Sequence, residues 1–277
     1  MRFYQPTSIR EFIKVSSSLS GEFVTLLAGG TDLLPRYERG QIMPDHLIDL
    51  KKLSDLYHIN IKDDTIQIGA LTSIQAIQEK PLIQSEFTAL HMAAHDFAGA
   101  QIRHRGTLGG NIVNASPAGD LLPSLYAFGA TLTLIGPDGE RQLPIQDFIL
   151  GPGKTALKQN EILVSIGLKR TEYKSTFQKV GLRQSMAISV ASLAFVFSEK
   201  EGVFDYLKIA CGAVAPTIVT LDKLTSTILD NTSTPEEWPL LIEADISPID
   251  DIRATAKYRK QVVNNLVQAF LRKELSV

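Results

Sequence analysis

The sequence predicts an α+β protein, because different parts of the chain carry different strand patterns. Over residues 1–53, short apolar runs alternate with helical patterns, which indicates strands joined by helices. From Tyr57 onward, apolar runs lie on either side of polar turns, which indicates antiparallel hairpins. We expect a β-α-β-α-β unit over 1–53, a middle α+β segment over 54–168, and a C-terminal segment over 169–277 built from an antiparallel sheet and helices.

In the first segment, Ser8 and Glu11 form a capping box that begins a helix over about residues 8–17. The apolar run 23–27 predicts a strand, which ends at the glycine turn Ala28-Gly29-Gly30-Thr31-Asp32. A helical pattern restarts at Leu33, until Pro35 and Gly40 interfere, and residues 46–50 predict a further strand.

The other two segments predict both hairpins and helices. The middle segment predicts a hairpin of residues 57–61 and 65–69, helices over 71–78, 87–97 and 120–128, and strands over 131–135, 141–143 and 161–168. The C-terminal segment predicts strands over 177–180, 186–197 and 206–213, and helices over about 220–229 and 252–273.

Composition and charge exclude several classes of protein. The net charge of −2 and the isoelectric point near 6.2 leave no basic surplus for a nucleic-acid backbone. The longest apolar stretch, residues 186–197, is too short to span a bilayer, and the N-terminus lacks the apolar core of a signal peptide. The single cysteine, Cys211, can form no internal disulfide and cannot hold an iron–sulfur cluster on four thiolates. We therefore expect a cytoplasmic protein without nucleic-acid or membrane partners.

The sequence does not match several familiar functional motifs. Gly153-Lys154-Thr155 is not a P-loop, because Phe148 stands where that motif needs a glycine. No G-x-G-x-x-G follows a strand, which disfavours a Rossmann fold. His91 and His95 lie four residues apart on a helix, but no third ligand is evident, so no metal site is predicted. Cys211 lies in an apolar strand and is interpreted as a buried, small apolar residue.

The stretch 103–121 contains four glycines and a run of small polar or acidic residues. Its pattern favours neither a helix nor a strand running through it. Glycine lets backbone N–H groups and short polar side chains approach a ligand, because it has no Cβ. A tight surface turn is the alternative, but the polar run is too long and too mixed for a simple turn.

The turn Ala28-Gly29-Gly30-Thr31-Asp32 is a second candidate loop. A glycine turn between a strand and a helix directs several N–H groups at one point, which suits a phosphate or pyrophosphate. The later sequence Thr107-Leu108-Gly109-Gly110-Asn111 has a similar composition. Together the two loops suggest a site that closes on one extended, multiply charged ligand.

These loops belong to a set of five motifs that resembles a known family. The motifs 28–32, 107–111, 116–120, 151–155 and 212–216 occur in the order and approximate spacing of the FAD-binding subunit of molybdenum hydroxylases. That family includes the flavin subunits of xanthine dehydrogenase and carbon monoxide dehydrogenase. The resemblance implies a vanillyl-alcohol-oxidase (PCMH) type FAD-binding fold, followed by a C-terminal α+β domain of the carbon monoxide dehydrogenase flavoprotein type. It is specific for the family and weakly specific for the substrate.

The resemblance also implies, by position, which residues bind FAD. The loop that would wrap the pyrophosphate and ribityl chain comprises Leu26, Leu27, Ala28, Gly29, Gly30, Thr31, Asp32 and Leu33. The diphosphate and its surroundings would contact Thr107, Gly110, Asn111 and Asn114. Asp120 would take the adenosine ribose or a nearby hydroxyl, and Lys179 would reach the polar edge of the flavin ring. Phe97 and Ala98 would flank the isoalloxazine, and Ile162 and Leu163 would line the adenine side. No catalytic side chain is expected, because the cofactor carries the electron chemistry.

The resemblance implies partners as well. Electrons would arrive from an iron–sulfur small subunit and leave to NAD+, while the substrate would bind on a separate molybdenum-cofactor large subunit. We expect the xanthine dehydrogenase type, with the flavin subunit of a carbon monoxide, nicotinate or aromatic-ring dehydrogenase as the alternative. A flavin-free scaffold and a nucleotide-binding regulatory module are alternatives of another class. The two glycine loops count against a scaffold, which would have no need of backbone laid open to a ligand.

Overall fold

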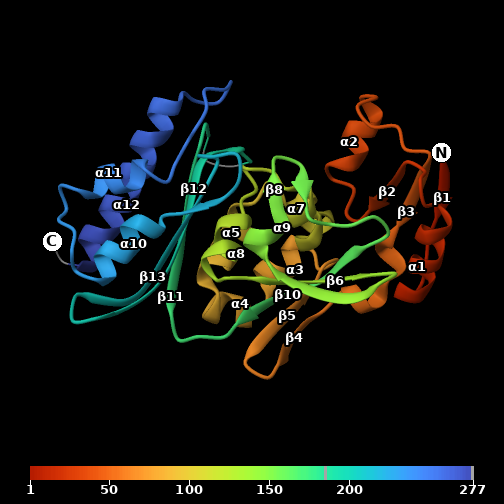
Figure 1. The fold of residues 1–277 in the computed structure, drawn as a ribbon, viewed down its shortest axis with the longest axis horizontal. Coiled ribbons are helices and arrows are strands. Elements are labelled where there is room, and N and C mark those ends of the chain that lie inside the picture. Colours follow the sequence, from red (N-terminus) through yellow and green to blue (C-terminus); the bar gives the residue numbers. More distant parts are fainter. Residues whose placement is uncertain (184–185, 276–277) are drawn as a thin grey trace.

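The computed structural model describes residues 1–183 and 186–275, and these form three larger sheets and one two-stranded sheet. The N-terminal unit, red in Figure 1, and the C-terminal helices, blue, lie at opposite ends of the molecule, with the five-stranded sheet and its helices between them. The division at 1–53, 54–168 and 169–277 stays a prediction. Each larger sheet lies inside one of these segments, except that one strand of the middle sheet ends one residue past 168, at Lys169. No helix in the described ranges is long and apolar enough to cross a membrane.

Three parallel strands form the N-terminal sheet, in the order β1-β3-β2. The first helix is capped as predicted, since Ser8 Oγ accepts a hydrogen bond from the Glu11 backbone N–H. The second helix continues through Pro35, because a proline in the first turn gives up no intrahelical hydrogen bond. The elements are β1 (Arg2–Tyr4), α1 (Ile9–Ser18), β2 (Val24–Leu27), α2 (Leu33–Glu38), β3 (His46–Asp49) and the 3-10 turns η1 (Leu50–Lys52) and η2 (Ser54–Leu56).

Five antiparallel strands form the second sheet, in the order β4-β5-β10-β6-β7. Ile66, Ile68, Leu132 and Leu134 are fully buried in one core with the middle helices. The strands are β4 (Ile59–Lys62), β5 (Thr65–Gly69), β6 (Thr131–Gly136), β7 (Gly139–Pro144) and β10 (Ile162–Lys169), and a small hairpin is made of β8 (Ile149–Gly151) and β9 (Lys154–Thr155). The helices are α3 (Ile74–Glu79), α4 (Pro81–Glu86), α5 (Thr88–Asp96), α6 (Ala100–Arg105), α7 (Leu108–Asn114), α8 (Leu122–Ala127) and α9 (Ile145–Phe148).

Two short helices, α6 and α7, occupy parts of the stretch 103–121, and no single helix or strand runs through it, as expected. α6 ends at Arg105, and α7 begins after Thr107, whose Oγ1 accepts a hydrogen bond from the Gly110 N–H at 3.1 Å. A Cβ at Gly109 would lie 2.7 Å from Ala70, so glycine allows α7 to approach the end of β5 closely. Neither helix was predicted, because glycine has a low helix propensity and the contact of Gly109 with Ala70 joins residues far apart in the sequence.

Other element boundaries differ from the predicted ones for local reasons. The helix predicted over 71–78 begins at Ile74, because Ser73 Oγ caps it by accepting from the Ala76 N–H. α4, which begins at Pro81, was not predicted at all. The last helix begins at Ala256 and not at 252, because Asp251 Oδ1 accepts from the backbone N–H groups of residues 253 and 254 and holds them in a turn.

Four antiparallel strands form the third sheet, in the order β11-β12-β13-β14, and helices pack on both of its faces (Figure 1). On β12, Ala194 and Val196 join the core that contains α5 and α8, whereas Leu193 and Phe195 join the core that contains α10 and α12. Coverage of both faces explains the nearly continuous apolar run in this strand. The elements are β11 (Lys174–Gly181), β12 (Ser189–Lys200), β13 (Val203–Gly212), β14 (Val219–Thr220), α10 (Asp222–Leu229), α11 (Trp238–Glu243) and α12 (Ala256–Leu275).

Candidate cofactor-binding site

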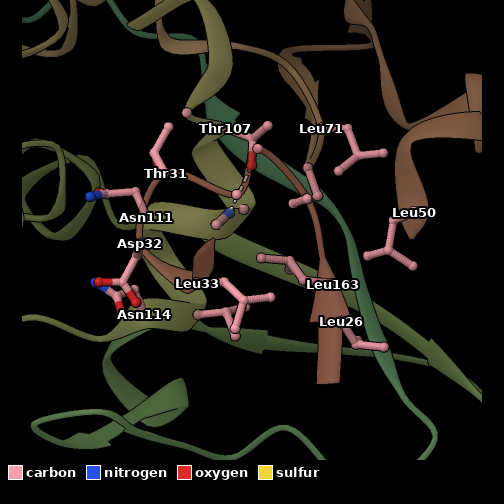
Figure 2. A pocket seen from close by; sticks show the side chains of 18 of the residues that line it. Leu26, Thr31, Asp32, Leu33, Leu50, Leu71, Thr107, Asn111, Asn114 and Leu163 are labelled. Carbon is pink, nitrogen blue, oxygen red and sulfur yellow. Dashed lines mark hydrogen bonds between the residues drawn. The ribbon is translucent and has the colours of Figure 1, made fainter. Parts of the chain in front are cut away.

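A cavity of about 450 Å³ lies where the N-terminal unit meets the middle segment (Figure 2). This volume is typical of small-molecule sites. Its walls come from β2 and the glycine turn after it, from α2, α6 and α7, and from the start of β10. The lining residues are Thr25, Leu26, Ala28, Gly29, Gly30, Thr31, Asp32, Leu33, Arg36, Ile42, Leu50, Ala70, Leu71, Ile74, Phe97, Ile102, Gly106, Thr107, Gly109, Gly110, Asn111, Val113, Asn114, Leu157, Ile162 and Leu163.

The cavity has an apolar end and a polar end, as Figure 2 shows. The side chains gathered at the apolar end include Leu26, Leu50, Leu71 and Leu163. The side chains at the polar end include Thr31, Asp32, Asn111 and Asn114. Apolar walls favour an aromatic ring, and hydroxyl and amide groups favour phosphates and sugar hydroxyls. The cavity therefore suits a long ligand that carries a ring system beside a polar chain.

The glycine turn 28–32 lies against residues 105 and 106, which directly precede the second glycine loop, 107–111. A Cβ at Gly29 would fall 1.9 Å from the carbonyl oxygen of Arg105, and one at Gly106 would lie 3.6 Å from Thr31 Oγ1. Backbones this close leave no room for a side chain at position 29. Gly29 is therefore required by the contact between the loops, which differs from the role of opening the backbone to a ligand that its composition suggested.

The first turns of α7 present polar groups to the cavity. The Gly110 N–H is already bonded to Thr107 Oγ1, which caps the helix. By contrast, Asn111 Oδ1 is buried and has no hydrogen-bond partner among the described residues. A buried acceptor without a donor costs free energy, so its position indicates where a ligand donor belongs. The hydroxyl groups of a ribityl or ribose chain are such donors, and the residues of this wall therefore fit FAD.

Phe97 lines the cavity from a turn, residues 97–98, that Arg103 stabilises. One guanidinium nitrogen, Nη1, donates to the carbonyl oxygens of Phe97 and Ala98, both at 3.1 Å. Ala98 has a φ of +40°, a left-handed conformation that is unfavourable for a residue with a Cβ. The two hydrogen bonds therefore stabilise a strained turn beside the cavity. Sequence reasoning missed Arg103, because its carbonyl partners are defined only by the fold.

Most of the residues predicted to bind the cofactor lie in the cavity wall. Those outside it are Leu27, Ala98, Asp120 and Lys179. Leu27 follows Leu26 in β2, and successive side chains of a strand point to opposite sides. The wall also contains residues that the sequence did not single out, among them Arg36, Ile42, Ala70, Ile74, Ile102 and Val113.

Asp120 and Lys179 lie outside the wall and are bonded to each other. Lys179 Nζ donates to Asp120 Oδ2 at 2.6 Å and to the Asp96 carbonyl at 3.1 Å, and Ser189 Oγ donates to Asp120 Oδ1 at 2.6 Å. Burial raises the pKa of Asp120 above its ordinary value, and the bonds from Lys179 and Ser189 oppose that rise. Each carboxylate oxygen of Asp120 thus already accepts a hydrogen bond within the protein. Contacts of these two residues with FAD stay predictions.

The fold and the cavity define a protein that binds a long, partly aromatic cofactor. Residues 1–168 match the family described as the FAD binding domain in molybdopterin dehydrogenase, and residues 175–273 match the CO dehydrogenase flavoprotein C-terminal domain. The chain therefore belongs to the FAD-binding, medium-subunit family of molybdenum hydroxylases, and its cofactor is FAD. The predicted family, fold and cofactor are confirmed, and the flavin-free alternatives are excluded.

The relatives that align with most of this chain are subunits of different enzymes. The carbon monoxide dehydrogenase medium chain of Hydrogenophaga pseudoflava is 30% identical over 273 residues, with 97% of this chain and 95% of the relative covered. A putative xanthine dehydrogenase FAD-binding subunit of Escherichia coli (strain K12) is 31% identical over 250 residues, with 88% and 86% covered. The solved carbon monoxide dehydrogenase of Hydrogenophaga pseudoflava that lacks the Mo-pyranopterin moiety has a chain with a TM-score of 0.91 at 29% identity, with 97% and 95% covered. This chain is a flavin subunit of a molybdenum hydroxylase complex.

Proposed function

We propose that this chain transfers electrons within a xanthine dehydrogenase-type complex in the cytoplasm, from an iron–sulfur small subunit to NAD+. A molybdenum-cofactor large subunit would oxidise the substrate. The observation that carries the proposal is the cavity at the meeting of the two glycine loops, with the unpartnered Asn111 Oδ1 in its wall, in a chain of the flavin-subunit family. The similarity to the Escherichia coli subunit supports the xanthine dehydrogenase type.

The residues of this chain would bind and orient the cofactor. Bound FAD supplies the redox chemistry, because it accepts electrons from one centre and passes them to another. The leucines of the apolar end would remove a ring system from water, and the threonine and asparagine side chains of the polar end would bind phosphate and sugar oxygens. Arg103 would keep the turn at residues 97–98 rigid beside the bound cofactor.

The iron–sulfur donor would be located on another subunit. Cys211 is fully buried within β13, and burial raises the pKa of its thiol far above the ordinary value. A neutral, inaccessible thiol is a poor metal ligand, and the sequence contains no other cysteine. Electrons would therefore have to reach FAD from a cluster bound by a partner.

The flavin subunit of a carbon monoxide dehydrogenase is the second candidate. It is favoured by coverage, since the similarity to the carbon monoxide dehydrogenase medium chain extends over 97% of this chain, compared with 88% for the xanthine dehydrogenase relative. Both candidates predict the same FAD site, because they differ in the chemistry of the large subunit.

A complex purified through a tag on this chain tests the proposal. We expect xanthine to bleach the flavin absorbance and NAD+ to restore it, with formation of reduced pyridine nucleotide. Bleaching by carbon monoxide, together with no response to xanthine, would support the second candidate instead. Flavin that is reduced by xanthine but reoxidised only by oxygen or a quinone would contradict NAD+ as the acceptor.

A further inference from the structure

The wall of the FAD cavity contains one pair of opposite charges. Asp32 and Arg36 lie one helical turn apart at the start of α2, and Arg36 Nη1 is 3.4 Å from Asp32 Oδ2. Within the part of the chain that the structure describes, they are the only charged side chains in the wall. The wall therefore has no net charge before the cofactor binds.

A diphosphate brings negative charge to this neutral wall. The N–H groups of the two glycine loops are dipoles and supply no net charge. The carboxylate of Asp32, at the polar end, repels an incoming phosphate unless a cation stays beside it. Among cationic side chains, the planar guanidinium of arginine can bind two phosphate oxygens at once. Arg36 is the wall residue that has this chemistry.

The bond between Arg36 and Asp32 is weak enough to be exchanged. It is a single contact between side chains that are 46% and 53% exposed. Elsewhere in the chain, Arg141 bonds both oxygens of Glu161 at 2.7 and 2.8 Å, and that carboxylate is largely buried. Exposed, single-contact pairs contribute little to stability, because water screens them and the side chains lose freedom. Arg36 can therefore turn from Asp32 to a stronger acceptor at little cost.

We propose that Arg36 is the counter-ion of the FAD diphosphate and is held by Asp32 until the cofactor binds. The inference rests on FAD as the cofactor of this chain, and it assigns to Arg36 the preference for a phosphorylated flavin. Arg36 adds net charge where the two glycine loops add hydrogen bonds. It is a cofactor-binding residue and takes no part in electron transfer.

The test compares Arg36→Gln with Arg39→Gln in the full chain. Arg39 is the C-cap of the same helix, is exposed, and lies outside the cavity wall. Arg39→Gln therefore removes the same charge from the helix as Arg36→Gln, but it removes no proposed contact with the diphosphate. FAD and riboflavin are titrated into apo-protein and binding is followed by flavin fluorescence. We expect the Kd for FAD to rise about tenfold in Arg36→Gln, as for a lost charge-assisted hydrogen bond, and to stay unchanged in Arg39→Gln. Riboflavin should bind all three proteins equally.

Salt provides a second measurement on the same proteins. Added salt should weaken FAD binding to the wild type and to Arg39→Gln more than to Arg36→Gln. Only the first two proteins retain the attraction between the Arg36 guanidinium and the diphosphate, which salt screens. Arg36→Lys should recover part of the affinity. Equal FAD affinity and equal salt dependence in Arg36→Gln and Arg39→Gln would overturn the proposal, as would a parallel loss of riboflavin binding. A wild type that binds neither flavin would instead contradict the FAD assignment itself.

Discussion

Lys179 and Asp120 form a buried ion pair of 2.6 Å that links β11 to the turn before α8. Each side chain is only 9% exposed, and Ser189 on β12 donates a further hydrogen bond to the same carboxylate. Two strands of the third sheet are thus tied to the glycine-rich stretch that supplies the cavity wall. Removing one member of a buried pair is costly, because it leaves the other charge without a partner.

Lys179→Met should lower the free energy of unfolding by about 3 kcal/mol at pH 7. A carboxyl group whose pKa is raised in the folded protein binds more protons in the folded state than in the unfolded state. Its contribution to stability therefore falls as the pH rises from the pKa of the unfolded chain through the pKa of the folded protein. Without Lys179 the pKa of Asp120 should rise further, and the deficit of the variant should therefore be smaller at pH 5 than at pH 7. Urea denaturation at both values measures this difference. Lys169→Met is the control, since that lysine is 73% exposed, and a deficit of equal size at both pH values would contradict the explanation.

Glu161→Gln should destabilise the protein at neutral pH by about 1.5 to 3 kcal/mol, because the residue loses charge-assisted hydrogen bonds to Arg141. Those bonds lower the pKa of Glu161 below its ordinary value of 4.5. The stabilisation is therefore present above the pKa of the unfolded chain and is lost as the pH falls through the folded pKa. Thermal unfolding between pH 7 and pH 3 should show a smaller decline for Glu161→Gln than for the wild type. An equal loss of thermal stability in both proteins between pH 7 and pH 3 would mean that the ion pair of Arg141 and Glu161 does not contribute to acid unfolding.

Gly29→Ala should strongly reduce bound flavin, because its Cβ would overlap the Arg105 carbonyl and separate the two glycine loops. The readout is the ratio of flavin to protein absorbance after reconstitution with FAD, and we expect this ratio to fall far below that of the wild type. Gly151→Ala is the matched control, since the Cβ it would add meets no atom of the described residues within 4 Å, its own chain neighbours aside. Normal flavin content in Gly29→Ala would show that the contact between the loops is not needed for the site.

Asn111→Leu should separate FAD binding from stability. The variant removes a buried oxygen for which the described residues offer no donor, so the apo-protein should be as stable as the wild type or slightly more stable. Its Kd for FAD should rise about tenfold, because a hydroxyl donor of the cofactor loses its acceptor. Denaturation of apo-protein and a fluorescence titration with FAD measure the two effects. Unchanged affinity would place Asn111 outside the contact with the cofactor.

Patterns between close neighbours in the sequence predicted much of the framework. The capping box at Ser8 and Glu11 determines where α1 begins, and the period-two alternation around residues 62–64 determines the β4–β5 hairpin. These features depend on residues a few positions apart, so they can be read without the fold. The composition of the two glycine loops likewise indicated that they act together, and the structure places Gly29 against Arg105 and Gly106.

Features set by distant residues could not be predicted in this way. α7 approaches the end of β5 closely where Gly109 meets Ala70, and neither residue signals the other in the sequence. The partners of Arg103, and the pairing of Asp120 with Lys179 across 59 positions, are likewise defined only when the chain has folded. Arg36 was overlooked because an arginine on a short helix without buried residues resembles any exposed residue until the cavity beside it is known.

A crystal structure of the chain with FAD tests the central claim most directly. We predict that one ring system of the cofactor lies among Leu26, Leu50, Leu71 and Leu163, and that the diphosphate lies at the polar end near Thr31 and Asn111. FAD bound elsewhere, or bound in this cavity with its diphosphate among the leucines, would contradict the account.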